Sequence, residues 1–350
     1  MKTALLGKTP QELAEVVTSV GLKPFAAGQI ARWMYVRRAA SFDEMTDISK
    51  EGRERLKAEY ELGTAAPIGS AQSSDGTAKF LFPVSCPVAG SFEDSAVEAV
   101  VIPDEDRRTL CVSSQAGCKM GCKFCMTGRQ GYHGSLSAAQ ILNQFVSIPD
   151  SGSLTNAVFM GMGEPLDNYD EVMRAIEALT APWGFGWSPK RITLSTVGVL
   201  PALKRYLDTC RCHLAVSVHN PFPDERESMM PVQKAWPLKD IVELIRRYDF
   251  TGQRRVSFEY TMFAGFNDTK RHADAMVRLL SGLECRVNLI RFHKIPDFPY
   301  ESSPDAVMTM FRDRLSAHGI TCTIRASRGE DILAACGMLA GKNKLNSARL

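Results

Sequence analysis

From Leu110 onward, short strand-like stretches alternate with amphipathic helical stretches. Strands that alternate with helices build a parallel sheet through right-handed crossovers. In barrels of this kind the active site lies at the carboxyl-terminal ends of the strands. The pattern therefore predicts an α/β fold and directs attention to the strand ends. The expected strands are Leu110–Ser113, Asn156–Met160, Arg191–Ser195, His213–Val218, Val256–Met262, Arg286–Ile290 and Thr321–Ile324, and the helices include Ser137–Ile148, Tyr169–Leu179, Leu238–Tyr248 and Thr269–Leu280.

A helical module is expected ahead of this region, at residues 1–63. Thr9 can cap a helix whose first residue is Pro10 and whose capping box is completed by Glu12. Two further amphipathic helices fit Ala26–Arg37 and Ser49–Leu62. The basic residues on their polar faces could be solvated or could bind RNA phosphates, and charge alone favours the first. They are Arg32, Arg37, Arg38, Lys50, Arg53 and Arg55.

Residues 64–106 show short alternating runs separated by turn residues, which predict a small antiparallel β linker before residues 107–350. Its strands are expected at 78–82 and 97–103. Glu98 lies on the second strand among apolar neighbours. The alternation favours an outward side chain, whereas an inward carboxylate would have a raised pKa and could act as a base.

The bulk properties are those of an ordinary soluble protein. Of 350 residues, 45% are hydrophobic and 23% are charged, and no apolar run is long enough to span a membrane. The N-terminus lacks the apolar core and cleavage pattern of a signal peptide, so we expect a cytoplasmic protein. Ten cysteines in such a chain indicate metal binding or catalysis rather than disulfides. The net charge of +3 permits nucleic-acid binding without requiring it.

Cys118, Cys122 and Cys125 form a Cys-x3-Cys-x2-Cys pattern, with Cys111 shortly upstream. Thiolates are soft ligands for zinc or for iron–sulfur clusters. Structural zinc usually has four protein ligands, so three cysteines in one loop favour a site with one open position. If the metal is a [4Fe–4S] cluster, one iron would lack a protein ligand and could bind substrate or cofactor. A zinc knuckle completed by His133 is the alternative.

The cysteine pattern resembles the signature of radical S-adenosylmethionine (SAM) enzymes. Its context, Leu110-Cys-Val-Ser-Ser-Gln-Ala-Gly-Cys118, is similar to the RlmN/Cfr family, which methylates an adenine carbon in RNA, and more similar to the RlmN branch. The stretch beginning Gly28-Gln-Ile-Ala-Arg-Trp resembles the N-terminal domain of that branch and favours RNA binding. The resemblance implies a partial (βα)6 TIM-type barrel.

The resemblance also implies SAM contacts at several strand ends. Gly163 and Glu164 match the family's Gly-Glu-Pro segment, and Ser195 matches a family serine. A Ser-Val-His segment matches another SAM segment, although a lone histidine at a strand end is more often structural. His293 stands where the family commonly has asparagine, and a neutral imidazole could replace that hydrogen bond. The Ser-Val-His residues are Ser217, Val218 and His219.

Three further residues take catalytic roles by the same resemblance. Cys336, in Arg-Gly-Glu-Asp-Ile-Leu-Ala-Ala-Cys-Gly, matches the cysteine that is S-methylated and carries the methylene to RNA. Met338 replaces the glutamine usual after this motif. Glu98 matches the proton acceptor, and Cys111 would resolve the protein–RNA thioether through a transient disulfide with Cys336. The remaining cysteines are interpreted as structural: Cys86, Cys210, Cys212, Cys285 and Cys322.

The implied enzyme methylates adenine C2 in 23S rRNA and in tRNA. It consumes two SAM molecules per methylation, and it holds one cluster per chain. Its other expected partner is a low-potential electron donor such as flavodoxin, and we expect a monomer that does not bind membranes. A Cfr-type adenine C8 methyltransferase that confers antibiotic resistance, and a zinc-knuckle RNA-binding protein, are the alternatives.

Overall fold

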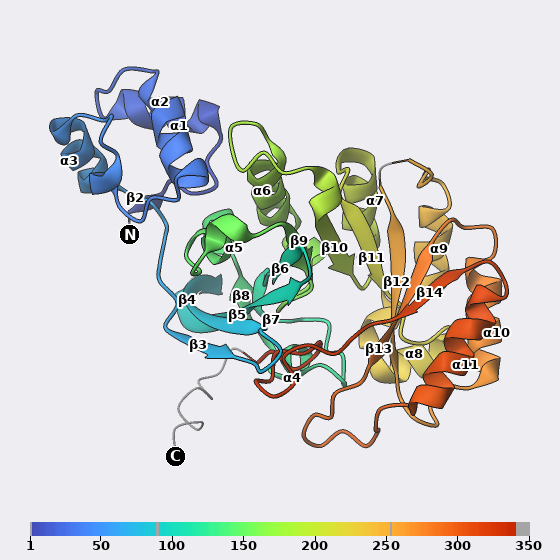
Figure 1. Cartoon of the computed structure of the whole chain (residues 1–350). Helices are drawn as coiled ribbons and strands as arrows, with labels where there is room; N and C mark the ends of the chain where they lie inside the picture. Colours follow the sequence, from blue (N-terminus) through green and yellow to red (C-terminus); the bar gives the residue numbers. More distant parts are fainter. Residues whose placement is uncertain (1, 89–90, 253, 341–350) are drawn as a thin grey trace, which may run out of the picture.

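A computed structural model describes residues 2–88, 91–252 and 254–340. The N-terminal module lies at one corner of the molecule, beside α6 (Tyr169–Thr180) (Figure 1). The capping box of Thr9 and Glu12 is present as predicted. Its helices are α1 (Pro10–Ser19), α2 (Ala26–Ala31) and α3 (Lys50–Glu59), and β1 (Thr3–Ala4) pairs in parallel with β2 (Tyr60–Glu61).

The second predicted helix is only partly correct. After Ala31 the chain continues as one wider π-helical turn, Arg32–Val36, instead of regular α-helix to Arg37. This turn buries Trp33, whose indole donates to Asp47 across 2.6 Å. A single π turn re-aims the side chains that follow it, and periodicity alone does not detect such a turn.

The module packs against the rest of the chain through Tyr35. Its ring lies 5.5 Å from that of Trp183 and 5.8 Å from that of Phe185. The Tyr35 hydroxyl accepts a hydrogen bond from the Gly7 backbone across 2.9 Å. On the surface, Arg174 of α6 forms an ion pair with Glu12.

One sheet of ten strands runs through the remainder of the described chain, in the order β14-β13-β12-β11-β10-β9-β6-β5-β4-β3. From β6 to β14 all neighbours are parallel, and the order does not close on itself, as expected for a partial barrel. The parallel strands are β6 (Arg107–Cys111), β9 (Asn156–Phe159), β10 (Ile192–Thr196), β11 (His213–Ser217), β12 (Val256–Met262), β13 (Arg286–Arg291) and β14 (Thr321–Ile324).

The two predicted linker strands are present, pair antiparallel and extend this same sheet. They are longer than predicted, as β4 (Ala78–Val88) and β5 (Ser91–Asp104), and β5 pairs with β6. A strand that was not predicted, β3 (Gly69–Gln72), pairs with β4. The β linker is therefore continuous with the barrel wall. A separate small hairpin, β7 (Gln115–Gly117) with β8 (Tyr132–Ser135), flanks the cysteine loop.

The first barrel strand ends two residues earlier than predicted. The Gln144 side chain accepts from the Ser113 backbone N–H and donates to its carbonyl, both across 2.9 Å. These bonds replace a strand ladder at Ser113, and the chain turns away. Strand prediction from alternation does not foresee a side chain that mimics the backbone in this way.

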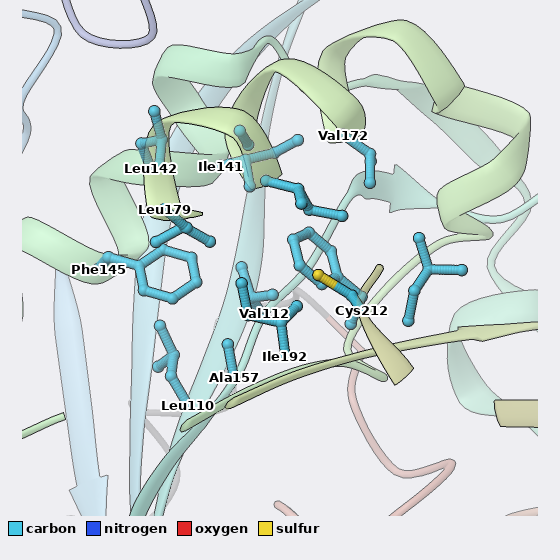
Figure 2. Close-up of a cluster of buried hydrophobic side chains, with 14 of the residues drawn as sticks. Leu110, Val112, Ile141, Leu142, Phe145, Ala157, Val172, Leu179, Ile192 and Cys212 are labelled. Carbon is cyan, nitrogen blue, oxygen red and sulfur yellow. The ribbon is translucent and has the colours of Figure 1, made fainter. Parts of the chain in front are cut away.

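Helices link the parallel strands and bury their apolar faces against them (Figure 1). Figure 2 shows Leu142 and Phe145 of α5 and Leu179 of α6 facing Leu110 and Ile192 on the strands. This core fixes the strand ends that carry the site. The helices are α4 (Met126–Arg129), α5 (Ala138–Val146), α6, α7 (Leu200–Thr209), α8 (Pro223–Met229), α9 (Leu238–Ile245), α10 (Lys270–Leu280) and α11 (Asp305–Ser316).

Candidate active site

A cavity of about 170 Å³ lies at the carboxyl-terminal ends of the parallel strands. Each strand from β9 to β13 contributes a residue at or just beyond its end, and the cysteine loop and the C-terminal segment complete the wall. The polar lining residues are Cys118, Cys122, Cys125, Glu164, Ser195, Thr196, Ser217, His219, Glu259, Thr261 and Cys336. Residues far apart in sequence thus meet at the edge where such sheets carry their active sites.

The three motif cysteines all line this cavity. Their loop follows β7, and Gly121 makes its turn with a φ of +64°, which favours glycine. The loop is held at both ends: the Cys118 N–H donates to the Gly131 carbonyl across 2.8 Å, and the Lys123 N–H donates to the Met229 carbonyl across 3.0 Å.

These thiols fit a cluster. Burial, together with neighbouring negative charges, raises the pKa of the Cys118 thiol to about 12 and that of Cys122 well above its ordinary value. Thiols in such a place become thiolates when iron binds them. No group of three or more His, Cys, Asp or Glu side chains within the described ranges could hold a metal ion directly. In an iron–sulfur cluster, each thiolate binds a different iron, so the three sulfur atoms need not converge on one point. It is enough that the three cysteines line one cavity.

Glu164 is a buried carboxyl group, 3% exposed, at the turn after β9. Burial raises its pKa to about 7, against three hydrogen bonds that favour the carboxylate. Thr196 Oγ1 donates to Oε1 across 2.6 Å, and the Val197 N–H donates to Oε2 across 2.9 Å. The carboxyl group is therefore held rigidly at the cavity wall.

Gly163 has a φ of +97°, and a Cβ there would lie 2.5 Å from the Cβ of Gln115. Glycine is thus required both by conformation and by space. Ser195 and Ser217 line the cavity at the ends of β10 and β11. Val218 is fully buried in the core instead, so any contact from it would come through its backbone.

His219 has a left-handed backbone, with φ of +53°. Its Nδ1 accepts a hydrogen bond from the Thr261 backbone N–H across 2.9 Å. Burial lowers the pKa of the imidazole to about 3, so the ring is neutral. An accepting Nδ1 places the proton on Nε2, and His219 lines the cavity as a hydrogen-bond donor.

A second cavity, of about 150 Å³, adjoins the first and shares Cys125, Glu259 and Cys336 with it. Cys111 lines this second cavity, so the structure brings Cys111 and Cys336 together. Burial raises the pKa of the Cys111 thiol to about 12 and also raises that of the Cys336 thiol. A Cys111 thiolate could form a disulfide by attacking the Cys336 sulfur when that sulfur carries a group that can leave.

The C-terminal segment is fastened to the cysteine loop. The Met126 N–H donates to the Gly337 carbonyl across 2.8 Å, and Thr127 Oγ1 donates to the Leu339 carbonyl across 2.7 Å. These bonds hold Cys336 between the two cavities.

His293 lies in the second cavity and not among the lining residues of the first. Its Nδ1 is 3.4 Å from a carboxylate oxygen of Glu330. Phe292 lines the first cavity in its place. His293 therefore shares the second cavity with Cys111 and Cys336.

Glu98 is buried, contrary to the outward orientation that alternation favours. Its Oε1 lies 3.1 Å from Lys79 Nζ, and its Oε2 accepts from the Ala340 N–H across 2.8 Å. It is not among the lining residues of either cavity. The alternative zinc ligand His133, on β8, does not line the cysteine cavity either.

The sequence analysis did not identify two buried charged residues, one that lines the cavities and one next to them. Glu259 lines both cavities; Ser257 and Asn288 donate to its Oε1, and burial raises its pKa. An acidic residue inside an apolar strand was the available signal. Arg226, on α8 in an acidic stretch typical of a solvated helix, gave no signal but is fully buried.

The family model described as the radical SAM superfamily matches residues 112–278, and the one described as the ribosomal RNA large subunit methyltransferase N-terminal domain matches residues 3–62. In the described chain, no helix is long and apolar enough to cross a membrane.

Similar proteins cover nearly the whole length. One from Porphyromonas gingivalis, named probable dual-specificity RNA methyltransferase RlmN, is 57% identical over 97% of this chain and 94% of its own. A dual-specificity RNA methyltransferase RlmN from Syntrophus aciditrophicus is 39% identical, over 95% and 94%. The crystal structure of a radical SAM methyltransferase from Sphaerobacter thermophilus matches with a TM-score of 0.90 and 37% identity, over 97% of this chain and all of the other.

Proposed function

The chain belongs to the RlmN family of radical SAM RNA methyltransferases, and from this we propose that it methylates C2 of an adenine in 23S rRNA and in tRNA. The observation that carries the proposal is the shared cavity of the cysteine triad and Cys336. A cluster loop beside a separate thiol is what methyl transfer through a protein cysteine requires.

Membership in the family implies SAM and a [4Fe–4S] cluster. We propose one cluster per chain, bound by Cys118, Cys122 and Cys125, with two SAM molecules consumed per methylation. When bound, these groups supply reductive SAM cleavage and a radical that activates the methyl group, which polar transfer to the weakly nucleophilic adenine C2 does not provide.

The residues at the strand ends would bind and orient SAM. Glu164 in its carboxylate form would accept from the ammonium group, with Gly163 allowing close approach. Ser195, Ser217 and the Nε2–H of His219 supply hydrogen bonds along the same wall. Val218 would contribute only backbone atoms, and His293 would act near the two catalytic cysteines.

Cys336 would carry the methyl group and form the covalent link to RNA. The Cys111 thiolate would then attack the Cys336 sulfur. The S–S bond forms as the bond from that sulfur to the methylene carbon breaks, and the carbon leaves with the electron pair and takes up a proton to become the methyl group of the RNA. Glu98 would accept the C2 proton. Because Ala340 now donates to Glu98, this hydrogen bond must break before Glu98 can reach RNA.

The N-terminal module would contribute RNA phosphate contacts through exposed arginines such as Arg32 and Arg37. Arg38 is a poor candidate, because it is half-buried against the ring of Phe185, 5.9 Å from its centroid. We further propose that the enzyme is a cytoplasmic monomer and that a flavodoxin-like protein donates the electron.

The two alternatives are less well supported. A Cfr-type C8 activity is not favoured, because the relatives described above carry the RlmN name. The zinc-knuckle hypothesis is not favoured either, because the radical SAM match covers the cysteine loop within a full-length enzyme family.

The decisive experiment is an anaerobic assay of the reconstituted protein on rRNA fragments and on tRNA. Mass spectrometry of the digested nucleosides should identify 2-methyladenosine in both. A product methylated at C8 would support the Cfr activity, and the absence of any methylated adenosine would overturn the proposal.

A further inference from the structure

Arg226 is a fully buried cation directly behind the wall of the cysteine cavity, where its guanidinium donates to the carbonyls of two lining residues, Val197 and Ser217. All of its hydrogen bonds go to neutral oxygens. Its Nε donates to the Val218 carbonyl across 3.1 Å, and its two terminal nitrogens donate to the Ser217 carbonyl and to Gln233 Oε1 across 3.0 and 2.7 Å. It thus spans the end of β11 and the segment after α8.

No carboxylate forms an ion pair with Arg226 in the described parts of the chain, and its neighbour Glu225 is paired with Arg271 and His272. A buried charge without a counter-charge is strongly destabilising. Burial lowers the pKa of Arg226 to about 10, so it stays charged at neutral pH. Its geometry therefore calls for an anion.

The helix that carries Arg226 lies against the cysteine loop, in the part next to Cys122. The two are held together by backbone: Lys123, next to Cys122, donates to the carbonyl of Met229, which ends the helix that carries Arg226. The side chains of Cys122, Met229 and Met230 belong to one buried apolar cluster that excludes water.

We propose that Arg226 is the built-in counter-ion of the cysteine triad and that its charge raises the reduction potential of the cluster bound there. This inference rests on the proposed function. Three thiolates give the bound [4Fe–4S] group a net negative charge, and reduction adds one more electron. A fixed positive charge nearby stabilises the reduced form more than the oxidised form, most strongly where water is excluded.

The competing explanation is that Arg226 only satisfies backbone carbonyls. Arg254 provides the matched case: it is buried, and it donates to the carbonyls of Leu207 and Cys210 across 2.9 and 2.7 Å. It precedes β12, at the opposite end of the strands from the cysteine cavity. If both arginines only satisfy carbonyl groups, neither charge should affect the reduction potential of the cluster. If Arg226 is a counter-ion, only its charge should affect that potential.

Gln233→Glu tests the charge while preserving the fold. Gln233 Oε1 accepts from Arg226 and from the Leu238 N–H across 3.1 Å, and a glutamate oxygen can accept both bonds. The new carboxylate cancels the Arg226 charge with almost no change in shape. Arg226→Lys retains the charge, and Arg254→Met is the control.

The readout is the midpoint potential of the reconstituted cluster, titrated with dithionite as the one-electron donor and followed by electron paramagnetic resonance. We expect Gln233→Glu to lower the reduced-to-oxidised ratio at a fixed potential at least tenfold, which is about 59 mV. Arg226→Lys and Arg254→Met should stay near the wild-type potential. Circular dichroism and iron content are measured on each variant.

A Gln233→Glu protein with full iron and an unchanged potential overturns the inference, and so does an equal shift in Arg254→Met. A folded Gln233→Glu protein that cannot hold a cluster, when Arg254→Met can, supports it. A wild-type protein that binds no cluster at all overturns the proposed function itself, and is thereby distinguished from a failure of the Arg226 inference alone.

Discussion

Glu164 should make the stability of this protein fall as the pH rises through neutrality. Its pKa is about 7 in the folded chain, against an ordinary value of 4.5. Between these values the folded state binds a proton that the unfolded state has lost, so stability decreases with rising pH. The contribution is fully present below pH 4.5 and is lost above about 7. At about 1.36 kcal/mol per pKa unit, the loss is about 3 kcal/mol.

Glu164→Gln removes the titration and should remove this pH dependence. The variant also pays a fixed penalty, because its amide N–H₂ would face the Val197 N–H that now donates to Oε2. The penalty does not depend on pH, so the comparison concerns the slope and not the absolute stability. Urea unfolding of the cluster-free protein under reducing conditions, at pH 5 and pH 8, measures both.

The exposed residue Glu243 supplies the control, since Glu243→Gln should leave the pH dependence of the wild type intact. If Glu164→Gln and the wild type lose the same free energy between pH 5 and pH 8, the buried carboxyl does not titrate as argued. The reasoning would be refuted if the losses of unfolding free energy in the wild type and in Glu164→Gln between pH 5 and pH 8 differed by less than about 1 kcal/mol, since a difference of about 3 is expected.

Four further outcomes are expected. SAM affinity, measured by equilibrium dialysis, should rise with pH through about 7, because only ionised Glu164 can pair with an ammonium group. Cys122→Ala should lose nearly all bound iron, counted with sulfide; full iron would contradict the ligand assignment. Cys336→Ala should form no protein–RNA adduct. Cys111→Ala should accumulate an adduct that survives denaturation and disappears with nuclease, so a denaturing gel with and without nuclease distinguishes the roles of the two cysteines. Arg37→Glu should weaken binding to rRNA and tRNA alike and lower the log–log salt slope by roughly one; an unchanged slope would make Arg37 an ordinary surface residue.

Local sequence was enough for much of the scaffold, because strand-like and helix-like stretches alternate along the chain. Val256–Met262 and Thr321–Ile324 are confirmed residue for residue. The resemblance supplied the residues of the site, and of these Ser195 and Cys336 do line one cavity. Neither source revealed Arg226, because a buried arginine and a solvated one look the same in an acidic stretch.

Two other predictions were wrong because they depend on contacts with residues distant in sequence. The inward orientation of Glu98 depends on Lys79 across the hairpin and on Ala340 from a distant segment. The early end of β6 depends on the Gln144 side chain. Patterns along the chain report how often apolar residues recur, but not which remote polar group will meet them.

The hydrogen bonds that hold the C-terminal segment set the order in which the site is assembled as the chain is made. The bonds from Thr127 to Leu339, from Gly329 to Asp75 and from Ala340 to Glu98 span 212, 254 and 242 residues. The cysteine loop and the linker hairpin are synthesised about two hundred residues before the segment that carries Cys336. Cys336 can therefore join the motif cysteines only after almost the whole chain has been made, so both cavities are completed last.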